Sequence, residues 1–488
     1  MDITTLFPLF EPTVGIGVLL VYGLFAFAMT YWYSKGYNSD KTSFLVARRE
    51  LGTFQGSLSV AAAWLWAPGL FISTQQAYVN GLVGLFWFCL GNFLTLGAFA
   101  YFAKLIRDRE PNGFTFSGYL RTRMSPRVQW LFVVEMLILA VCAFAINLIA
   151  GSTTVATLTG INYSLATVLM ASIAILYSFR TGLKATVITE VIKIIVVWTG
   201  VIILVPWAIS AGGGWETVVA GLGGKSGQGA SIFGTPFSWG VFTGFGAAAF
   251  LGHMGGPWGD NSFYQRAFSI KSKSIIPSYI IASFVFIVIP IMMGLLGFLA
   301  AGAGLEIPNN MVGNTNAIVI GTYLPGYAAI LFAFMIFAGL VSILDSQFAS
   351  VANMTGHDIY NQFKQGNDEN GAVTYARYGM IVLVIAALIV ANLPGMSMVY
   401  LFLFFAILRA AVWLPSMIAL LRPTWVTEAG MFWGILIAAI PGESMYIYAK
   451  LYGGGNDIAF AGTLLAIFGA PLFTLILSKK DRGSIAEA

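Results

Sequence analysis

The chain has 488 residues, of which 58% are hydrophobic and only 9% are charged, with a formal net charge of +5. Soluble domains carry about a quarter charged residues, so this composition excludes a water-covered globular surface. The positive charge does not indicate a nucleic-acid partner, because an excess of Lys and Arg in a membrane chain marks its cytoplasmic loops. We therefore expect an all-α membrane protein surrounded by lipid.

Apolar segments recur along the whole sequence, and most are close to the ~20 residues that cross the hydrocarbon layer. They predict about thirteen membrane-spanning helices. In chain order, the predicted spans lie at roughly 12–34, 53–80, 83–103, 128–149, 163–179, 185–208, 237–264, 276–300, 322–356, 376–393, 397–421, 430–449 and 458–478.

The positions of the Lys and Arg residues test this division of the chain into spans and loops. With the N-terminus outside, all but four of the 25 Lys and Arg residues fall in inside loops. Lys225 and Lys450 fall outside, and Lys193 and Arg409 fall within spans. This alternation follows the positive-inside rule. It predicts a protein of the cell (inner) membrane with its N-terminus outside and its C-terminus in the cytoplasm.

Two predicted spans contain helix-breaking residues. The second span has Pro68-Gly69 in mid-membrane, and the seventh has four glycines and Pro257 between residues 252 and 259. Proline removes a backbone donor and interrupts a helix. The two spans begin successive five-span blocks, and interrupted helices in corresponding positions of two halves indicate a transporter's binding site. A pair of proline kinks filled by neighbouring helices is the alternative.

Several motifs carry a family resemblance. They are AAAWLWAPGLF in the second span, LTGIN before the fifth, TGLKATVITEVIK in the sixth, WGDNSFYQRAF in the seventh and SILDSQFASVANMTGHDIY in the ninth. The chain resembles the sodium/solute symporter family over nearly its full length and is most similar to the urea-permease branch.

The resemblance implies an amino-acid/sodium symporter-like core, a five-plus-five inverted repeat with two broken helices and alternating access. The expected division is a first helix and cytoplasmic loop (1–52), a first repeat with an outer loop (53–236), a second repeat (237–422), and two final helices with a cytoplasmic tail (423–488).

The resemblance also implies a sodium site between the second and ninth spans. Its ligands would be the backbone carbonyls of Ala62 and Leu65 and the hydroxyl of Ser342. The family usually has a second Ser or Thr after that serine, and this chain has Ile343. Asp345 lies one turn from Ser342 on the same helix face, where it could complete a cation site or carry a proton. The alternative is a structural role, in which Asp345 caps a neighbouring helix or pairs with a cation such as Arg409.

Further charges lie within or beside the spans. Glu190 falls where the family has an acidic residue on the cation's cytoplasmic route, although an ion pair with Lys193 one turn away is an equal alternative. Asp260 and Arg266 would form an interfacial pair at the end of the seventh span. Arg409 has no partner evident in the sequence. Intramembrane charge is functional by default, although a structural arginine that bonds backbone carbonyls is an equal alternative.

Aromatic and amide side chains near the helix breaks suit a small neutral polar solute. The predicted substrate residues are Trp64, Trp66, Gln75, Trp258 and Tyr264. His253, beside the second break, would pack there or act in a gate.

We therefore expect a secondary symporter that couples a sodium or proton gradient to uptake of a small polar solute. Urea or a similar amide is the first candidate substrate. An amino-acid symporter of the proline type is the alternative within the class, and a passive channel or membrane sensor the alternative outside it. A channel would show no dependence on an ion gradient. No nucleophile–base pair or Cys/His cluster is evident, so we expect no enzyme activity and no catalytic residue. We also expect no cofactor beyond the coupling ion. No obligatory protein partner is evident from the sequence.

Overall fold

The computed structural model describes residues 6–34, 41–178, 183–360 and 369–486. Nearly all of these residues are helical, and none forms a strand; an isolated bridge joins Leu51 to Ile270. The predicted all-α membrane fold is confirmed.

The helices have the following bounds: α1 Pro12–Ser34, α2 Lys41–Val46, α3 Thr53–Trp64, α4 Ala67–Leu70, α5 Ile72–Arg109, α6 Phe116–Arg123, α7 Pro126–Thr159, α8 Tyr163–Ser178, α9 Leu183–Ala211, α10 Gly214–Ala220, α11 Pro236–Val241, α12 Asn261–Ser269, α13 Ile275–Gly302, α14 Thr315–Tyr323, α15 Gly326–Asn353, α17 Glu369–Ala391, α18 Met398–Leu421, α19 Glu428–Leu451, α20 Gly455–Leu464 and α21 Ala470–Ala486. Wider π-helical turns form η3 Phe242–Gly246, η4 Ala248–Gly252, η8 Met354–Ile359 and η10 Leu465–Gly469, and a tight 3-10 turn forms η5 Gly256–Trp258.

Ten helical segments of the described residues are long and apolar enough to cross a membrane. The other predicted spans, at 53–80, 163–179 and 237–264, consist of shorter or interrupted helices; residue 179 lies outside the described residues. The total of thirteen therefore stays a prediction.

Between the second and third predicted spans, Gly81 has a φ of 68°, and a Cβ there would lie 2.5 Å from the Leu222 carbonyl oxygen. Only glycine permits this turn.

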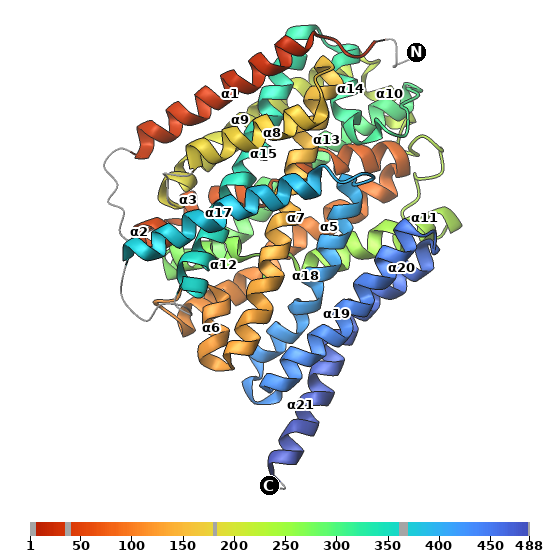
Figure 1. Ribbon diagram of the computed structural model, residues 1–488. Coiled ribbons are helices and arrows are strands. Elements are labelled where there is room, and N and C mark those ends of the chain that lie inside the picture. The colour runs from red at the N-terminus through yellow and green to blue at the C-terminus, as the bar shows by residue number, and fades with distance from the viewer. Residues whose placement is uncertain (1–5, 35–40, 179–182, 361–368, 487–488) are drawn as a thin grey trace.

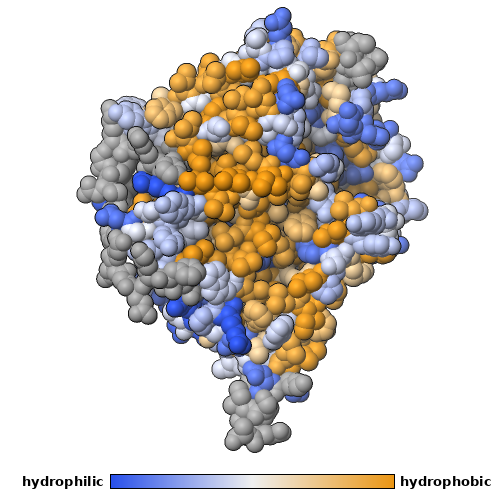
Figure 2. All heavy atoms as spheres, in the orientation of Figure 1, coloured by the Kyte–Doolittle hydropathy of each residue, from blue (hydrophilic) through white to orange (hydrophobic). Residues whose placement is uncertain are grey.

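The outer surface is apolar. Leu24 in α1, Leu176 in α8 and Val382 in α17 are 69%, 70% and 64% exposed. Figure 2 shows a broad apolar area across the middle of the visible face, with hydrophilic residues around its margins. Such a band would be unfavourable in water and matches the hydrocarbon layer.

The interior helices position the site. α3 packs against α9 and α13, and α15 packs against α7 and α9. The start of α1 and the end of α21 lie at opposite ends of the molecule (Figure 1). In the interrupted segments, α3 of 53–80 packs against α9 and α13, and η4 of 237–264 packs against α5 and α18. Both segments therefore lie among long helices.

Candidate functional site

The first helix break lies between α3 and α4. The N–H of Trp66 donates to the Trp64 carbonyl, and the N–H of Gly69 donates to the Trp66 carbonyl. In a continuous helix these two donors would serve the carbonyls of Ala62 and Leu65, four residues earlier. The break therefore frees two backbone oxygens, both on residues that are 1% exposed.

Two amide side chains from other helices fix this break. Asn147 of α7 accepts a hydrogen bond from the N–H of Ala67 at 3.0 Å. Asn316 of α14 donates to the carbonyl of Leu70 at 2.8 Å. Backbone groups released by the break are thus satisfied from outside the helix, as irregular backbone within a membrane requires.

The second break lies between η4 and α12, and its glycines allow close approach. A Cβ at Gly256 would lie 2.3 Å from the ring of Trp64. A Cβ at Gly259 would lie 2.6 Å from Cβ of Arg409 and 2.6 Å from a carboxylate oxygen of Glu135. The second break therefore runs directly against side chains of the first break, α7 and α18.

Buried rings surround Arg409 between the two breaks. We call this group the aromatic cluster; it consists of Arg409, Trp64, Trp66, His253, Phe402 and Phe405. The Arg409 guanidinium lies 4.3 Å from the ring centre of Phe405, 5.3 Å from that of Trp64 and 5.8 Å from that of Trp66. These are cation–π distances, and they hold the guanidinium in a fixed orientation.

Several polar atoms of the cluster and its neighbour Glu135 lack hydrogen-bond partners among the described residues. They include Nε1 of Trp64 and Trp66, Nε and Nη2 of Arg409, and both carboxylate oxygens of Glu135. No described ion pair joins Arg409 to Glu135 or Asp260. An unsatisfied buried polar group costs about 1–3 kcal/mol. The arrangement thus offers donors and acceptors to a small polar ligand.

Trp258 and Tyr264 lie together, facing away from the aromatic cluster. The Tyr264 hydroxyl donates to the Trp258 carbonyl at 3.0 Å. The Trp258 ring packs on Phe99 and Phe102 of α5, and the Tyr264 ring stacks on Phe116 of α6. Of the predicted substrate residues, the structure brings only Trp64 and Trp66 into the cluster.

No described contact joins Gln75 to the cluster. It is half-buried on α5, and its side chain forms no hydrogen bond with the described residues. Sequence reasoning missed Glu135, although a lone carboxylate in the apolar segment 128–149 is itself a signal of function. The sequence singles out Arg409 and His253, but their place beside the two tryptophans depends on the packing of α18 and η4 against the first break.

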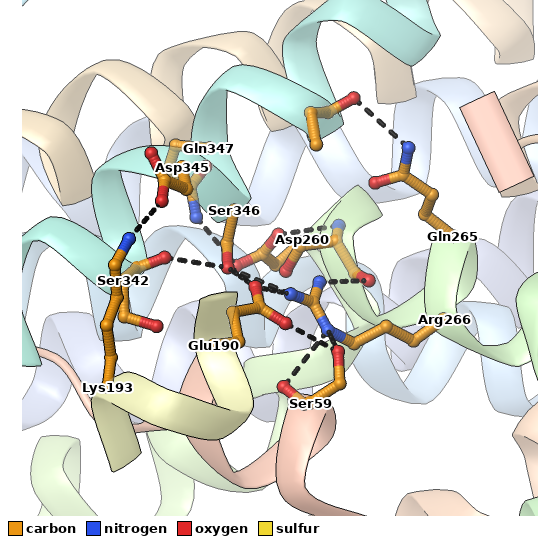
Figure 3. A network of polar contacts seen from close by, with 12 residues as sticks. Ser59, Glu190, Lys193, Asp260, Gln265, Arg266, Ser342, Asp345, Ser346 and Gln347 are labelled. Atoms are coloured by element: carbon orange, nitrogen blue, oxygen red, sulfur yellow. Dashed lines mark hydrogen bonds and ion pairs between the residues drawn. The ribbon is translucent and has the colours of Figure 1, made fainter. Parts of the chain in front are cut away.

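A buried polar network joins four elements around Glu190 (Figure 3). The Glu190 carboxylate forms an ion pair with Arg266 and accepts hydrogen bonds from the hydroxyls of Ser59 and Ser346, both at 2.6 Å. Arg266 also donates from Nε to the Ser59 carbonyl at 3.1 Å and from Nη1 to the Ser262 carbonyl at 3.0 Å. This network links α9, α3, α15 and α12.

The Arg266 contacts correct two expectations. The alternative that Glu190 pairs with Lys193 is wrong, because Arg266 is its partner. Arg266 does not pair with Asp260 at the interface: it is fully buried in α12, while Asp260 accepts from the Ser262 N–H at 2.8 Å and from Gln347 at 3.3 Å. A buried carboxylate in a membrane requires a counter-charge, and Arg266 supplies it.

Lys193 forms a second buried ion pair, with Asp345 of α15. The two residues are 1% and 3% exposed, and Figure 3 shows Lys193 reaching from α9 to Asp345. The suggested pairing of Asp345 with Arg409 is therefore wrong. Glu190 and Lys193 of α9 each have a partner on another helix, so the two pairs fix α9 against α12 and α15.

Only some of the predicted sodium ligands are free to bind a cation. Ser342 is 2% exposed and its hydroxyl has no hydrogen-bond partner in the described chain. With the carbonyls freed at Ala62 and Leu65, it gives three candidate oxygens. Ile343 gives none, and the Asp345 carboxylate is engaged by Lys193. The pairing with Lys193 depends on tertiary packing, so the sequence motif alone does not reveal it.

Known proteins share both the sequence pattern and the fold. A probable urea active transporter of Schizosaccharomyces pombe is 24% identical, over 96% of this chain and 77% of the relative. A urea-proton symporter of Oryza sativa subsp. japonica is 25% identical, over 94% of this chain and 70% of the relative. A sodium/pantothenate symporter of Haemophilus influenzae is 26% identical, over 89% and 90%.

Solved structures support the same fold. A Na⁺-coupled sialic acid symporter in a substrate-bound outward-open state aligns with a TM-score of 0.76 at 16% identity, covering 96% of this chain and 98% of that one. The nucleobase-cation-symport-1 transporter Mhp1 aligns with a TM-score of 0.54 at 14% identity, covering 90% and 96%. The sequence model of the sodium:solute symporter family matches residues 44–438. The chain therefore belongs to the sodium:solute symporter family and is an integral membrane symporter.

Proposed function

We propose that this symporter carries urea, driven by a proton gradient. The observation that carries the proposal is that unsatisfied Arg409 donors and unsatisfied Glu135 acceptors both lie next to Gly259, beside buried aromatic rings. The names of the relatives from Schizosaccharomyces pombe and Oryza sativa subsp. japonica support urea, and the name of the latter supports the proton.

Urea matches the chemistry of the cluster. It is planar, so it can stack against the faces of Trp64, Trp66 and Phe405. Its carbonyl oxygen accepts hydrogen bonds from the Arg409 guanidinium, and its N–H groups donate to the Glu135 carboxylate. Both buried charges thereby gain a hydrogen-bonding partner, which offsets the cost of holding them apart from water.

The helix breaks give this site a mechanism. The backbone of the second break approaches Trp64 at Gly256 and approaches Arg409 and Glu135 at Gly259, so a movement of this break changes the walls of the site. We place the two five-helix repeats at 53–236 and 237–422, with the N-terminus outside and the C-terminus in the cytoplasm. Movement of one repeat against the other would expose the cluster alternately to the two sides.

Counterflow in proteoliposomes tests the substrate. Vesicles loaded with unlabelled urea should concentrate external [¹⁴C]urea, and vesicles loaded with proline should not. Thiourea and acetamide serve as competitors, because acetamide lacks one of the amino groups that face Glu135. Labelled proline that is concentrated by proline-loaded vesicles, with no counterflow of urea, would establish the amino-acid alternative. Counterflow of neither solute would contradict the substrate assignment.

A further inference from the structure

Three helices meet at the carboxylate of Glu190 on α9. Ser59 of α3 and Ser346 of α15 each donate to it at 2.6 Å. This contact defines one level at which α3, α9 and α15 lie side by side. From it, the level of every nearby residue on these helices can be counted in helical turns.

α9 and α15 run in opposite directions. A Cβ at Gly339 of α15 would lie 2.8 Å from the side chain of Leu70 and 3.5 Å from that of Val197 of α9. A Cβ at Gly200 of α9 would lie 2.4 Å from the sulfur of Met335 of α15. Residue numbers therefore rise on α9 and on the segment 59–70 as they fall on α15. All three helices can be followed together from Glu190 towards the first break.

One turn towards the break, the same level contains Ala62 on α3, Lys193 on α9 and Ser342 on α15. This is the level at which the family resemblance puts the coupling sodium. Lys193 projects from this level, and its ammonium is paired with Asp345, one turn from Ser342. Lys193 is 1% exposed, so its charge is held within the protein.

Sodium does not fit these residues. The Asp345 carboxylate already has a cationic partner, Ile343 offers no oxygen, and a second cation would be repelled by Lys193 in a low-dielectric interior. We infer that the Lys193 ammonium takes the place of the coupling sodium, so that transport needs no sodium. The transport part of this inference rests on the proposed function; the binding part does not.

Sodium binding and sodium dependence test the inference. Purified wild-type protein should show no saturable ²²Na⁺ binding, and its [¹⁴C]urea uptake should change by less than about twofold when sodium is replaced by choline. Lys193→Ala removes the ammonium and leaves the Asp345 carboxylate with the Ser342 hydroxyl. That variant should bind ²²Na⁺ and gain a melting temperature that rises with sodium concentration.

Two variants serve as controls. Lys225→Ala makes the same change on an exposed outer loop and should bind no sodium. The double variant Lys193→Met with Asp345→Asn replaces both charges of the ion pair by neutral side chains and should also bind no sodium. Saturable sodium binding by the wild type would overturn the inference, as would a folded Lys193→Ala protein that binds no sodium. If Lys193→Ala does not fold, the wild-type binding result decides. Absence of urea uptake under every gradient, with these binding results intact, would contradict the proposed function alone.

Discussion

Replacing Glu135 by glutamine removes a charged hydrogen-bond acceptor beside the aromatic cluster and keeps the size of the side chain. Both carboxylate oxygens are unpartnered in the described chain, so the variant breaks no internal hydrogen bond. Hydrogen bonds to a charged group contribute about 1.5–3 kcal/mol. Loss of that contribution should raise the Kd for urea by roughly 10- to 150-fold.

The assay is counterflow as a function of urea concentration, with tryptophan fluorescence as a second readout because Trp64 and Trp66 lie in the site. Glu443→Gln is the matched control. Glu443 is also a buried carboxylate with two unpartnered oxygens, but it lies on α19 and belongs to none of the cluster's contacts. A folded Glu135→Gln protein with unchanged urea affinity would refute the reasoning, as would an equal loss in Glu443→Gln.

Three further predictions follow from the fold and the site. A cysteine at Lys225 should react with an impermeant reagent from outside and one at Arg121 only from the cytoplasm; the reverse pattern would overturn the proposed orientation. Trp64→Ala and Trp66→Ala should each weaken urea affinity by roughly two- to tenfold through lost ring contacts, measured by counterflow at matched protein level; unchanged affinity in both would assign them to packing. Asp345→Asn leaves Lys193 without its carboxylate and should abolish gradient-driven accumulation while sparing exchange; unaltered accumulation by a folded variant would contradict a coupling role.

The sequence was informative where the chemistry is local. Proline and glycine act on their own segment of backbone, so Pro68 and the glycines between 252 and 259 located both breaks. Composition and the spacing of apolar runs predicted the membrane fold for the same reason. The count of spans was harder, because interrupted helices such as those at 53–80 and 237–264 do not form single apolar helices of full length.

The partners of buried charges could not be predicted in this way. Glu190 and Lys193 are one turn apart on α9, yet they pair with Arg266 and Asp345, which lie 76 and 152 residues away in the sequence. Those pairings depend on how α12 and α15 pack against α9. Likewise, Trp258 is adjacent in sequence to residues of the second break that touch the cluster, but its ring turns towards α5.

Concentrative uptake is the most direct test of the central claim. Proteoliposomes with equal sodium on both sides and an inward proton gradient should accumulate [¹⁴C]urea above its external concentration, and a protonophore should collapse the excess. Urea that only equilibrates across the membrane, with or without the gradient, would identify a passive pathway and contradict proton-driven symport.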